Sequence, residues 1–222
     1  MKYKTLIFDL DRTLLRASDE YIFYWHKKCF KEVTGRDFTD EEIEDYLKKP
    51  IHERQNYILE VVGFDSVQQF LDMWITDEAI EQRMQSLVLY CDIRALLELK
   101  KRGVKLGLVT RSPEKLGSKE IEYLEEILRC ENLLNHAVYI IGSDLPMKPD
   151  PAALIFCMEQ LSADKPTTAY IGDLEMDIIM ANNVGIDAFL IDRGENTTDV
   201  LPSKMDTSHK RITSLNELLQ YI

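Results

Sequence analysis

Short apolar runs alternate with helix-like segments through the second half of the chain. Five runs have the continuous apolar character of strands covered on both faces, at residues 4–8, 104–109, 138–141, 168–171 and 188–191. Helical periodicity fills the intervals, at residues 93–101, 113–129, 151–160 and 176–183. This alternation predicts an α/β fold, with a parallel sheet of at least five strands and helices on both faces. Near the end, S-L-N-E at 214–217 matches a capping box and predicts a last helix over 215–221.

Residues 17–85 break the alternation. Apolar residues recur there at helical spacing, as at Trp25 and Cys29, and turn signals such as Gly35 interrupt them. We expect an all-helical module of three or four helices, inserted into an α/β domain made of residues 1–16 and 86–222. Trp25 and Trp74 are expected to be core residues of the module rather than a stacking surface for a substrate.

Composition narrows the classes of protein that fit. With 222 residues and 45% hydrophobic composition, the chain can bury a core, but its apolar runs are far shorter than the roughly 20 residues of a membrane span. The first residues lack the pattern of a secretory signal, and four scattered cysteines indicate reduced thiols, so we expect a cytoplasmic protein without a membrane partner. A net charge of −12 argues against nucleic acid as a partner. An anionic substrate would then need a local positive site or a metal.

Polar residues that could act in catalysis or bind a ligand follow the predicted strands. Asp9 and Asp11 come after the first run, Thr110 after 104–109, Lys148 after 138–141, and Asp173 after 168–171. Because the carboxyl ends of parallel strands converge on one crevice, we expect these residues to be neighbours. Taken singly, each has an ordinary explanation as a solvated turn, a loop residue or a helix cap.

Four motifs resemble, in the same order, those of the haloacid dehalogenase-like hydrolase superfamily. They are FDLDRTL at 8–14, VTRS at 109–112, KPDP at 148–151 and IGDLEMD at 171–177. The helical insertion resembles the C1 cap of that superfamily. The resemblance implies a Rossmann-like core with a helical cap over the crevice, and a Mg²⁺-dependent phosphatase of the phosphoglycolate phosphatase and β-phosphoglucomutase-like branch.

The resemblance also implies a role for each motif residue. Asp9 would be the nucleophile that forms an aspartyl-phosphate, and Asp11 the general acid and then base. Asp11 favours phosphoryl transfer, because the dehalogenase branch lacks an aspartate there. Asp9, Asp173 and the backbone carbonyl of Asp11 would bind Mg²⁺, which prefers oxygen ligands, with Asp177 as a partner outside the first ligand shell.

Substrate binding is implied for three further residues. Thr110 would bond a phosphoryl oxygen, Arg111 follows it in the same motif, and Lys148 would neutralise charge on Asp9 and the transferring group. Arg12 stands where many relatives have glycine, which is unproblematic if its φ is negative. Its side chain is expected to pair with an acid of the core or cap, the alternative being contact with an anionic substrate.

Several points stay open at the level of sequence. The substrate is a small phosphomonoester, such as phosphoglycolate, a sugar phosphate or a nucleoside monophosphate. A phosphomutase of the same fold is the nearest alternative to a phosphatase, and a catalytically silent binding protein is a third. The protein is expected to be a monomer or a homodimer.

Overall fold

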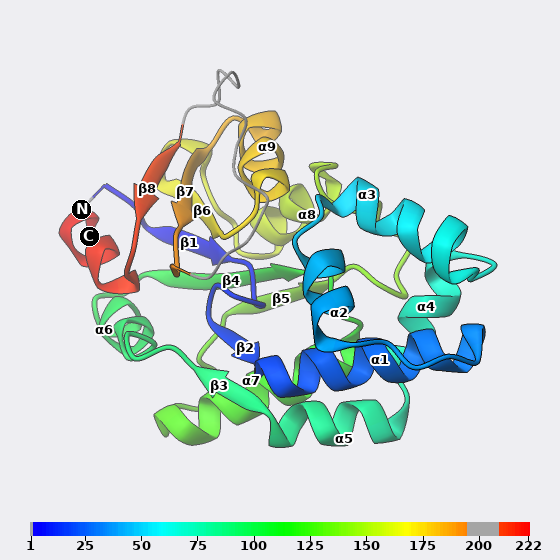
Figure 1. Ribbon diagram of the computed structural model, residues 1–222. Coiled ribbons are helices and arrows are strands. Elements are labelled where there is room, and N and C mark those ends of the chain that lie inside the picture. The colour runs from blue at the N-terminus through cyan, green and yellow to red at the C-terminus, as the bar shows by residue number, and fades with distance from the viewer. Residues whose placement is uncertain (1, 195–208) are drawn as a thin grey trace. The chain divides into compact units, whose positions relative to one another are not determined.

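The computed structural model describes residues 2–194 and 209–222, which form two compact units (Figure 1). The sheet unit contains residues 2–16, 89–194 and 209–222, and the helical unit contains residues 17–88. No helix in these described ranges is long and apolar enough to cross a membrane.

A six-stranded parallel sheet organises the first unit, which confirms the predicted α/β class. The strand order is β5-β4-β1-β6-β7-β8. The strands are β1 (Thr5–Phe8), β4 (Lys105–Thr110), β5 (His136–Tyr139), β6 (Thr168–Gly172), β7 (Asp187–Ile191) and β8 (Lys210–Ile212). Since β1 lies between β4 and β6, the ends of these three strands share one edge of the sheet, where the strand order reverses.

Two strand predictions need correction. β5 begins and ends two residues before the predicted run. Ile140 is buried but belongs to the loop after the strand, and apolar character alone does not distinguish a buried loop residue from a strand residue. The edge strand β8 was not predicted, since its sequence KRI carries two charges. Charged residues are common on edge strands.

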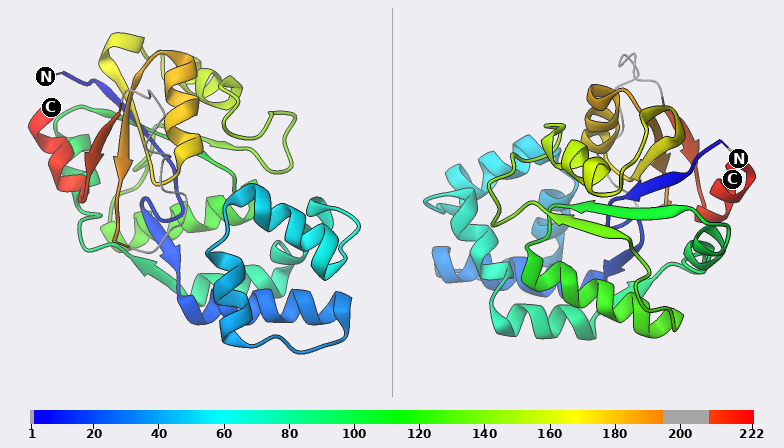
Figure 2. Two further views of the ribbon diagram at one scale, coloured as in Figure 1. Left: turned by 45° about the horizontal axis from the view of Figure 1, so that its top comes forward. Right: turned by 180° about the vertical axis from the view of Figure 1, so that it is seen from behind.

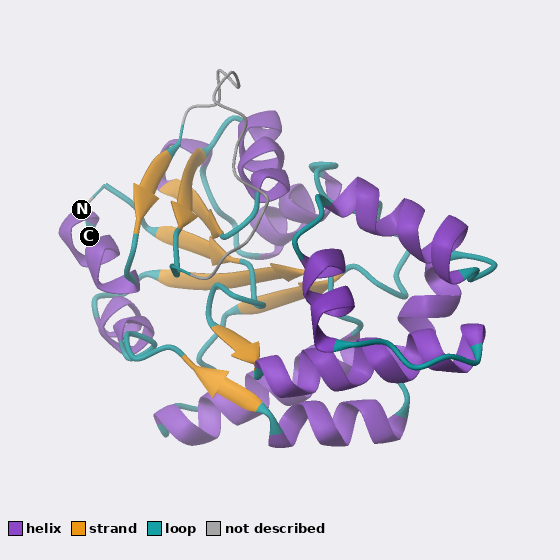
Figure 3. Ribbon diagram, viewed as in Figure 1, coloured by secondary structure: helices purple, strands orange, loops and turns teal. Residues whose placement is uncertain are grey.

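Helices cover both faces of the sheet (Figure 3). They are α6 (Ala95–Lys101), α7 (Glu114–Leu128), α8 (Ala152–Gln160) and α9 (Glu175–Val184), close to the predicted ranges. Buried residues of α8 and α9, such as Leu154 and Ile178, form one apolar cluster with Ile7 of β1 and Val109 of β4. The last segment, η3 (Leu215–Tyr221), has the predicted capping box but is a 3₁₀ helix. It lies beside the first residues of the described chain, where Lys2 N donates to Tyr221 O at 2.7 Å (Figure 2).

The helical unit contains more helices than the three or four that the sequence predicts. They are α1 (Asp19–Thr34), α2 (Asp40–Leu47), α3 (Ile51–Asn56), the π-helix η1 (Tyr57–Val62), α4 (Val67–Trp74) and α5 (Asp77–Gln85). The count was wrong because short helices begin at separate caps, with Thr39, Ser66 and Thr76 each accepting a backbone N–H. Trp25 is buried in the aromatic core of the unit and Trp74 packs against it, as expected.

A two-stranded sheet lies where the chain passes between the units. It pairs β2 (Leu15–Ala17) with β3 (Leu87–Leu89). Ser18 N donates to Ser86 O at 2.8 Å just beyond these strands. The loop after β1 therefore leads directly into the first of the two connections.

Candidate active site

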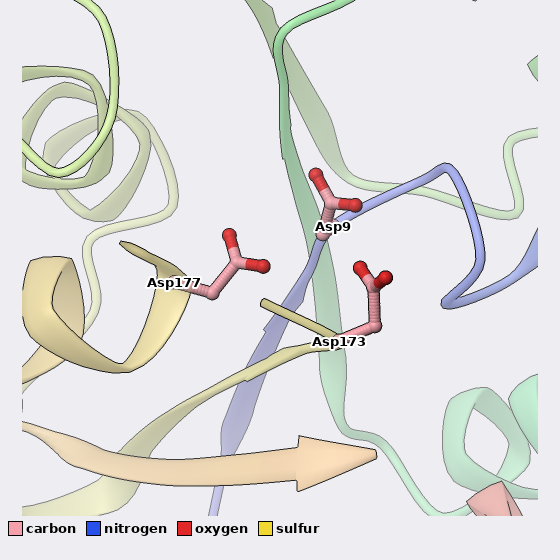
Figure 4. Close-up of side chains that lie close together, drawn as sticks. All are labelled: Asp9, Asp173 and Asp177. Carbon is pink, nitrogen blue, oxygen red and sulfur yellow. The ribbon is translucent and has the colours of Figure 1, made fainter. Parts of the chain in front are cut away.

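Three carboxylates meet at the edge of the sheet where β1 and β6 end. Asp9 follows β1, Asp173 follows β6, and Asp177 lies in the first turn of α9. One oxygen of each lies within 4.8 Å of the others, and the three side chains lie close together (Figure 4). All three residues are at least nine-tenths buried. Asp9 N donates to Ile171 O at 2.8 Å, which ties the backbone at Asp9 to β6.

Lys148 is the cation within this acidic cluster. Its Nζ donates to Asp9 Oδ1 at 2.6 Å, to Asp177 Oδ1 at 2.9 Å and to the Tyr170 hydroxyl at 2.8 Å. An ammonium group has three protons, so these three acceptors use all of them. The side chain is only 2% exposed. In this arrangement Lys148 orients Asp9, and a bond to a phosphoryl group would require one of the three bonds to be exchanged.

Tyr170 is a site residue that sequence reasoning missed. It lies in β6, fully buried, and its hydroxyl donates to Val109 O at 3.0 Å while accepting from Lys148. In the sequence TAYI, Tyr170 fits the pattern of an apolar strand residue. Its hydroxyl could have indicated a role in the site, since a tyrosine buried in a central strand needs a hydrogen-bond partner. Tyr170 thus links the position of Lys148 to the backbone of β4.

Asp177 has two functions in the local fold. One carboxylate oxygen accepts from Leu174 N at 3.2 Å, which satisfies a free amide at the start of α9, and the other accepts from Lys148. The close approach depends on Gly172, because a Cβ at this position would lie 2.4 Å from Asp177 Cγ. The sequence predicted Asp177 only as an outer partner of a metal.

Burial and charge shift the pKa values of the cluster. Burial raises the pKa of Asp9 to about 6, with Lys148 acting against the shift and Asp177 and Asp11 adding to it. Burial and the neighbouring charges of Asp9 and Asp177 raise the pKa of Asp173 well above its usual value. Burial alone would lower the pKa of Lys148, but the carboxylates of Asp177 and Asp9 outweigh it and raise that pKa. Lys148 is therefore charged, and the carboxylates outnumber it.

The loop after β1 folds into a tight turn over residues 10–15. The carbonyl of Leu10 accepts from the amides of Leu14 at 2.9 Å and of Thr13 and Leu15 at 3.3 Å, and Arg12 N donates to Leu15 O at 2.7 Å. Arg12 has a φ of +57°, so it adopts the left-handed conformation that glycine takes more easily, contrary to the negative φ that would have made it unproblematic. The positive charge of Arg12 acts to lower the pKa of Asp173, against the larger effects of burial and of the neighbouring carboxylates.

The remaining predicted residues lie around the cluster. Thr110 ends β4 beside β1, is buried, and its hydroxyl accepts from Ser112 N at 3.1 Å. Asp11 is half-buried in the turn and near enough to raise the pKa of Asp9. Arg111 is half-buried, and within the described ranges no hydrogen bond or ion pair joins it to the carboxylates.

The donor set suits a divalent cation. Three buried carboxylates lie beside one lysine, so negative charge is in excess. Burial first, and then repulsion from Asp9 and Asp177, raises the pKa of Asp173, and a bound cation would oppose both effects. Oxygen-only ligands of this kind are those of Mg²⁺. Asp9 and Asp173 are available to hold such an ion, and Asp177 lies beside them with both oxygens already bonded to protein groups.

The fold and the site together define an α/β protein with a carboxylate-lined site at the ends of its parallel strands. The profile of the haloacid dehalogenase-like hydrolases matches residues 6–191. The chain therefore belongs to the haloacid dehalogenase-like hydrolase family, and it is a hydrolase of the family's phosphatase branch.

Individual relatives agree with this assignment. A phosphoglycolate phosphatase of Pseudomonas fluorescens is 27% identical over 203 residues, which cover 87% of this chain and 71% of the relative. A phosphoglycolate phosphatase of Pseudomonas syringae is 31% identical over 121 residues, covering 53% of this chain and 42% of the relative, so the similarity to it spans less than half of its length.

Two solved structures share the fold. A HAD phosphatase from Thermococcus onnurineus superposes with a TM-score of 0.64 at 22% identity, covering 98% of this chain and 96% of the other. A β-phosphoglucomutase from Clostridium difficile gives a TM-score of 0.66 at 17% identity, covering 97% and 93%. At these identities the likeness concerns the fold alone.

Proposed function

We propose that the protein hydrolyses a small phosphomonoester, in a Mg²⁺-dependent reaction with an aspartyl-phosphate intermediate on Asp9. The observation that carries the proposal is the buried carboxylate of Asp9, held by Lys148 at 2.6 Å beside Asp173 and Asp177. A carboxylate fixed in this way is presented to an incoming phosphorus atom in one orientation, which is the main requirement for nucleophilic attack.

The proposed reaction has two steps. An Asp9 oxygen attacks phosphorus, the bond from phosphorus to the ester oxygen breaks, and Asp11 donates a proton to the departing alkoxide. Asp11 then takes a proton from water, the water oxygen attacks phosphorus, and the bond to Asp9 breaks to release phosphate. Asp9 must be ionised to attack phosphorus.

Other residues of the site bind and orient in this proposal. Thr110 donates to a phosphoryl oxygen, Arg111 contributes positive charge next to it, and Lys148 holds Asp9. Mg²⁺ would be bound by the carboxylates of Asp9 and Asp173 and the backbone carbonyl of Asp11, with Asp177 beside them. When bound, it supplies positive charge that offsets the repulsion between the nucleophile and the phosphate. The helical unit is proposed to act as the cap that selects the leaving group.

The proposal extends to the substrate and to the location of the protein. Phosphoglycolate is the first candidate, because the relatives named above are phosphoglycolate phosphatases. Sugar phosphates and nucleoside monophosphates follow. A cytoplasmic location is proposed on the basis of the four cysteines, all of which are free thiols.

Phosphate release from a panel of these esters tests the proposal. Wild type is assayed with Mg²⁺ and with EDTA, alongside Asp9→Asn and, as a matched control, Asp187→Asn at the far end of β7. We expect release with Mg²⁺ in wild type and the control, and none with EDTA or in Asp9→Asn. Release that survives Asp9→Asn would refute the mechanism. Transfer of phosphate to a second hydroxyl would identify a phosphomutase, and binding without turnover a silent member of the family.

The metal site has a test that does not depend on activity. A ligand that binds only the folded state raises its stability. Added MgCl₂ is therefore expected to raise the melting temperature of wild type but not of Asp173→Asn. An equal rise in both proteins would mean that Asp173 is not a ligand.

A further inference from the structure

A second buried ion pair lies at the same edge of the sheet, outside the acidic cluster. Arg193, two residues beyond β7, donates from Nη1 to Asp92 Oδ2 at 2.7 Å. The two side chains are 6% and 4% exposed. The Arg193 guanidinium carbon also lies 4.0 Å from the centre of the Tyr90 ring. An arginine side chain buried to this degree, with these partners, has a fixed orientation.

The second terminal nitrogen of Arg193 contacts the turn of residues 10–15. Its Nη2 donates to the carbonyl of Thr13 at 2.5 Å. Thr13 belongs to the turn of residues 10–15 that contains Asp11 and the left-handed Arg12. Strained backbone of this kind persists only where surrounding contacts hold it. Arg193 supplies such a contact from outside the turn.

Asp92 fixes the opposite side of Arg193. The carboxylate oxygen that binds Arg193 also accepts from Leu215 N at 2.7 Å, at the start of η3. Tyr90 and Asp92 follow β3, where the chain returns to the sheet unit. The guanidinium thus joins the turn after β1 to the segment after β3, and both segments adjoin the connections to the helical unit.

We propose that Arg193 is a positioning residue, which holds the turn of residues 10–15 through Thr13 O and thereby places Asp11 for proton transfer to the leaving group. The inference rests on the proposed function, in which Asp11 is the general acid. Loss of Arg193 should then affect the step that Asp11 assists more than steps that it does not. Protonation matters greatly for an alkoxide leaving group and little for p-nitrophenolate, which is stable as an anion.

The test compares kcat/KM for two esters, the alkyl phosphate turned over fastest in the panel above and p-nitrophenyl phosphate. A general acid contributes about 10²–10⁴-fold to such reactions. For Arg193→Met we expect kcat/KM to fall at least about tenfold more for the alkyl ester than for the aryl ester, because a misplaced acid loses part of that factor. Arg193→Lys keeps the charge but not the fork of donors, so it should give an intermediate ratio.

Arg102→Met is the matched control. Arg102 also donates to a backbone carbonyl of the sheet unit, that of Leu219 at 3.2 Å, but not to the turn. The Arg102→Met change should leave the ratio of the kcat/KM values for the two esters unchanged. The positioning role is wrong if Arg193→Met lowers kcat/KM by the same factor for both esters. It is also wrong if Arg102→Met lowers kcat/KM more for the alkyl ester than for the aryl ester, as Arg193→Met is expected to do.

Folding and function are separated by two further measurements. Arg193→Met leaves the buried charge of Asp92 without its partner and can unfold the protein, so Asp92→Asn combined with Arg193→Met removes both charges and is held to the same prediction. Suppose that wild type releases phosphate and Asp9→Asn does not, but the Arg193 variants lose kcat/KM equally for the two esters. That result overturns this inference alone. Wild type without such release overturns the proposed function and this inference with it.

Discussion

Lys148 Nζ lies 2.6 Å from Asp9 Oδ1, although 139 positions separate the two residues in the chain. The contact forms because β1 is central in the sheet and the loop after β5 returns toward its end. Asp177 and Tyr170 complete the coordination of the ammonium group. Lys148 is therefore the residue around which the buried charges of the site are organised.

Lys148→Met should be destabilised by about 3–5 kcal/mol, the usual cost of leaving one side of a buried ion pair without its partner. Asp9 would then be buried without its cation, so the loss should be larger at pH 8 than at pH 5, which is below the pKa of about 6 of Asp9. Activity should fall by about 10²-fold or more, since Asp9 is no longer oriented. Urea unfolding at the two pH values, with phosphate release, measures both effects.

Lys105→Met is the control for that variant. Lys105 also donates to a buried partner, Leu161 O at 2.6 Å, but it neutralises no carboxylate of the site. Its replacement should change the free energy of unfolding by about 1 kcal/mol, the net value of one hydrogen bond. A Lys148 variant as stable as this control would contradict the organising role of Lys148.

Tyr170→Phe should lower kcat while preserving the fold. The change removes one of the three acceptors of Lys148 and leaves Val109 O without the hydroxyl, at a cost of about 1–3 kcal/mol. Tyr3→Phe loses a comparable hydroxyl contact, to Asp187 at 2.5 Å, and should keep full activity. Equal kcat values in the two variants would show that the Tyr170 hydroxyl has no part in positioning Lys148.

Gly172→Ala should abolish most activity. The new Cβ would overlap the Asp177 carboxylate at 2.4 Å, and Asp177 can yield only by breaking its bonds to Leu174 N and Lys148. Gly107→Ala is the matched comparison, since its nearest contact is the flexible end of Leu161 at 2.7 Å. It should cost about 1–3 kcal/mol of stability through overpacking, without a specific loss of activity. Phosphate release and thermal unfolding of both variants decide the point.

Asp92 should contribute to the pH dependence of stability. Burial alone would raise its pKa, but the hydrogen bonds from Arg193 and Leu215 N outweigh burial and lower the pKa below its usual value. The stabilisation is therefore present above about pH 4, the pKa of an unfolded aspartate, and is lost as the pH falls through the lower, folded value. In Asp92→Asn, urea unfolding should show less stability at pH 7 and a smaller further loss toward pH 3. Parallel curves would refute the assignment.

The sequence by itself determined the α/β class, a helical segment after the first strand, and the strand ends at which Asp9, Thr110 and Asp173 lie. This was possible because apolar periodicity records burial residue by residue, and the ends of parallel strands share one edge of a sheet whatever their order. Lys148 lies farther on, in the loop after β5. Four ordered motifs then gave the family resemblance that the comparisons confirm.

Only the tertiary structure decided how these residues are held. Tyr170 is a strand residue by its pattern, and only the packing of β6 beside β1, with its ring among the core residues under α8 and α9, brings its hydroxyl to Lys148. Arg193 is 180 positions from Thr13, and nothing local to either predicts their contact. The left-handed φ of Arg12 likewise arises from the closed turn around it. Local patterns encode burial, but partners distant in the chain are selected by strand order and by which face each side chain occupies.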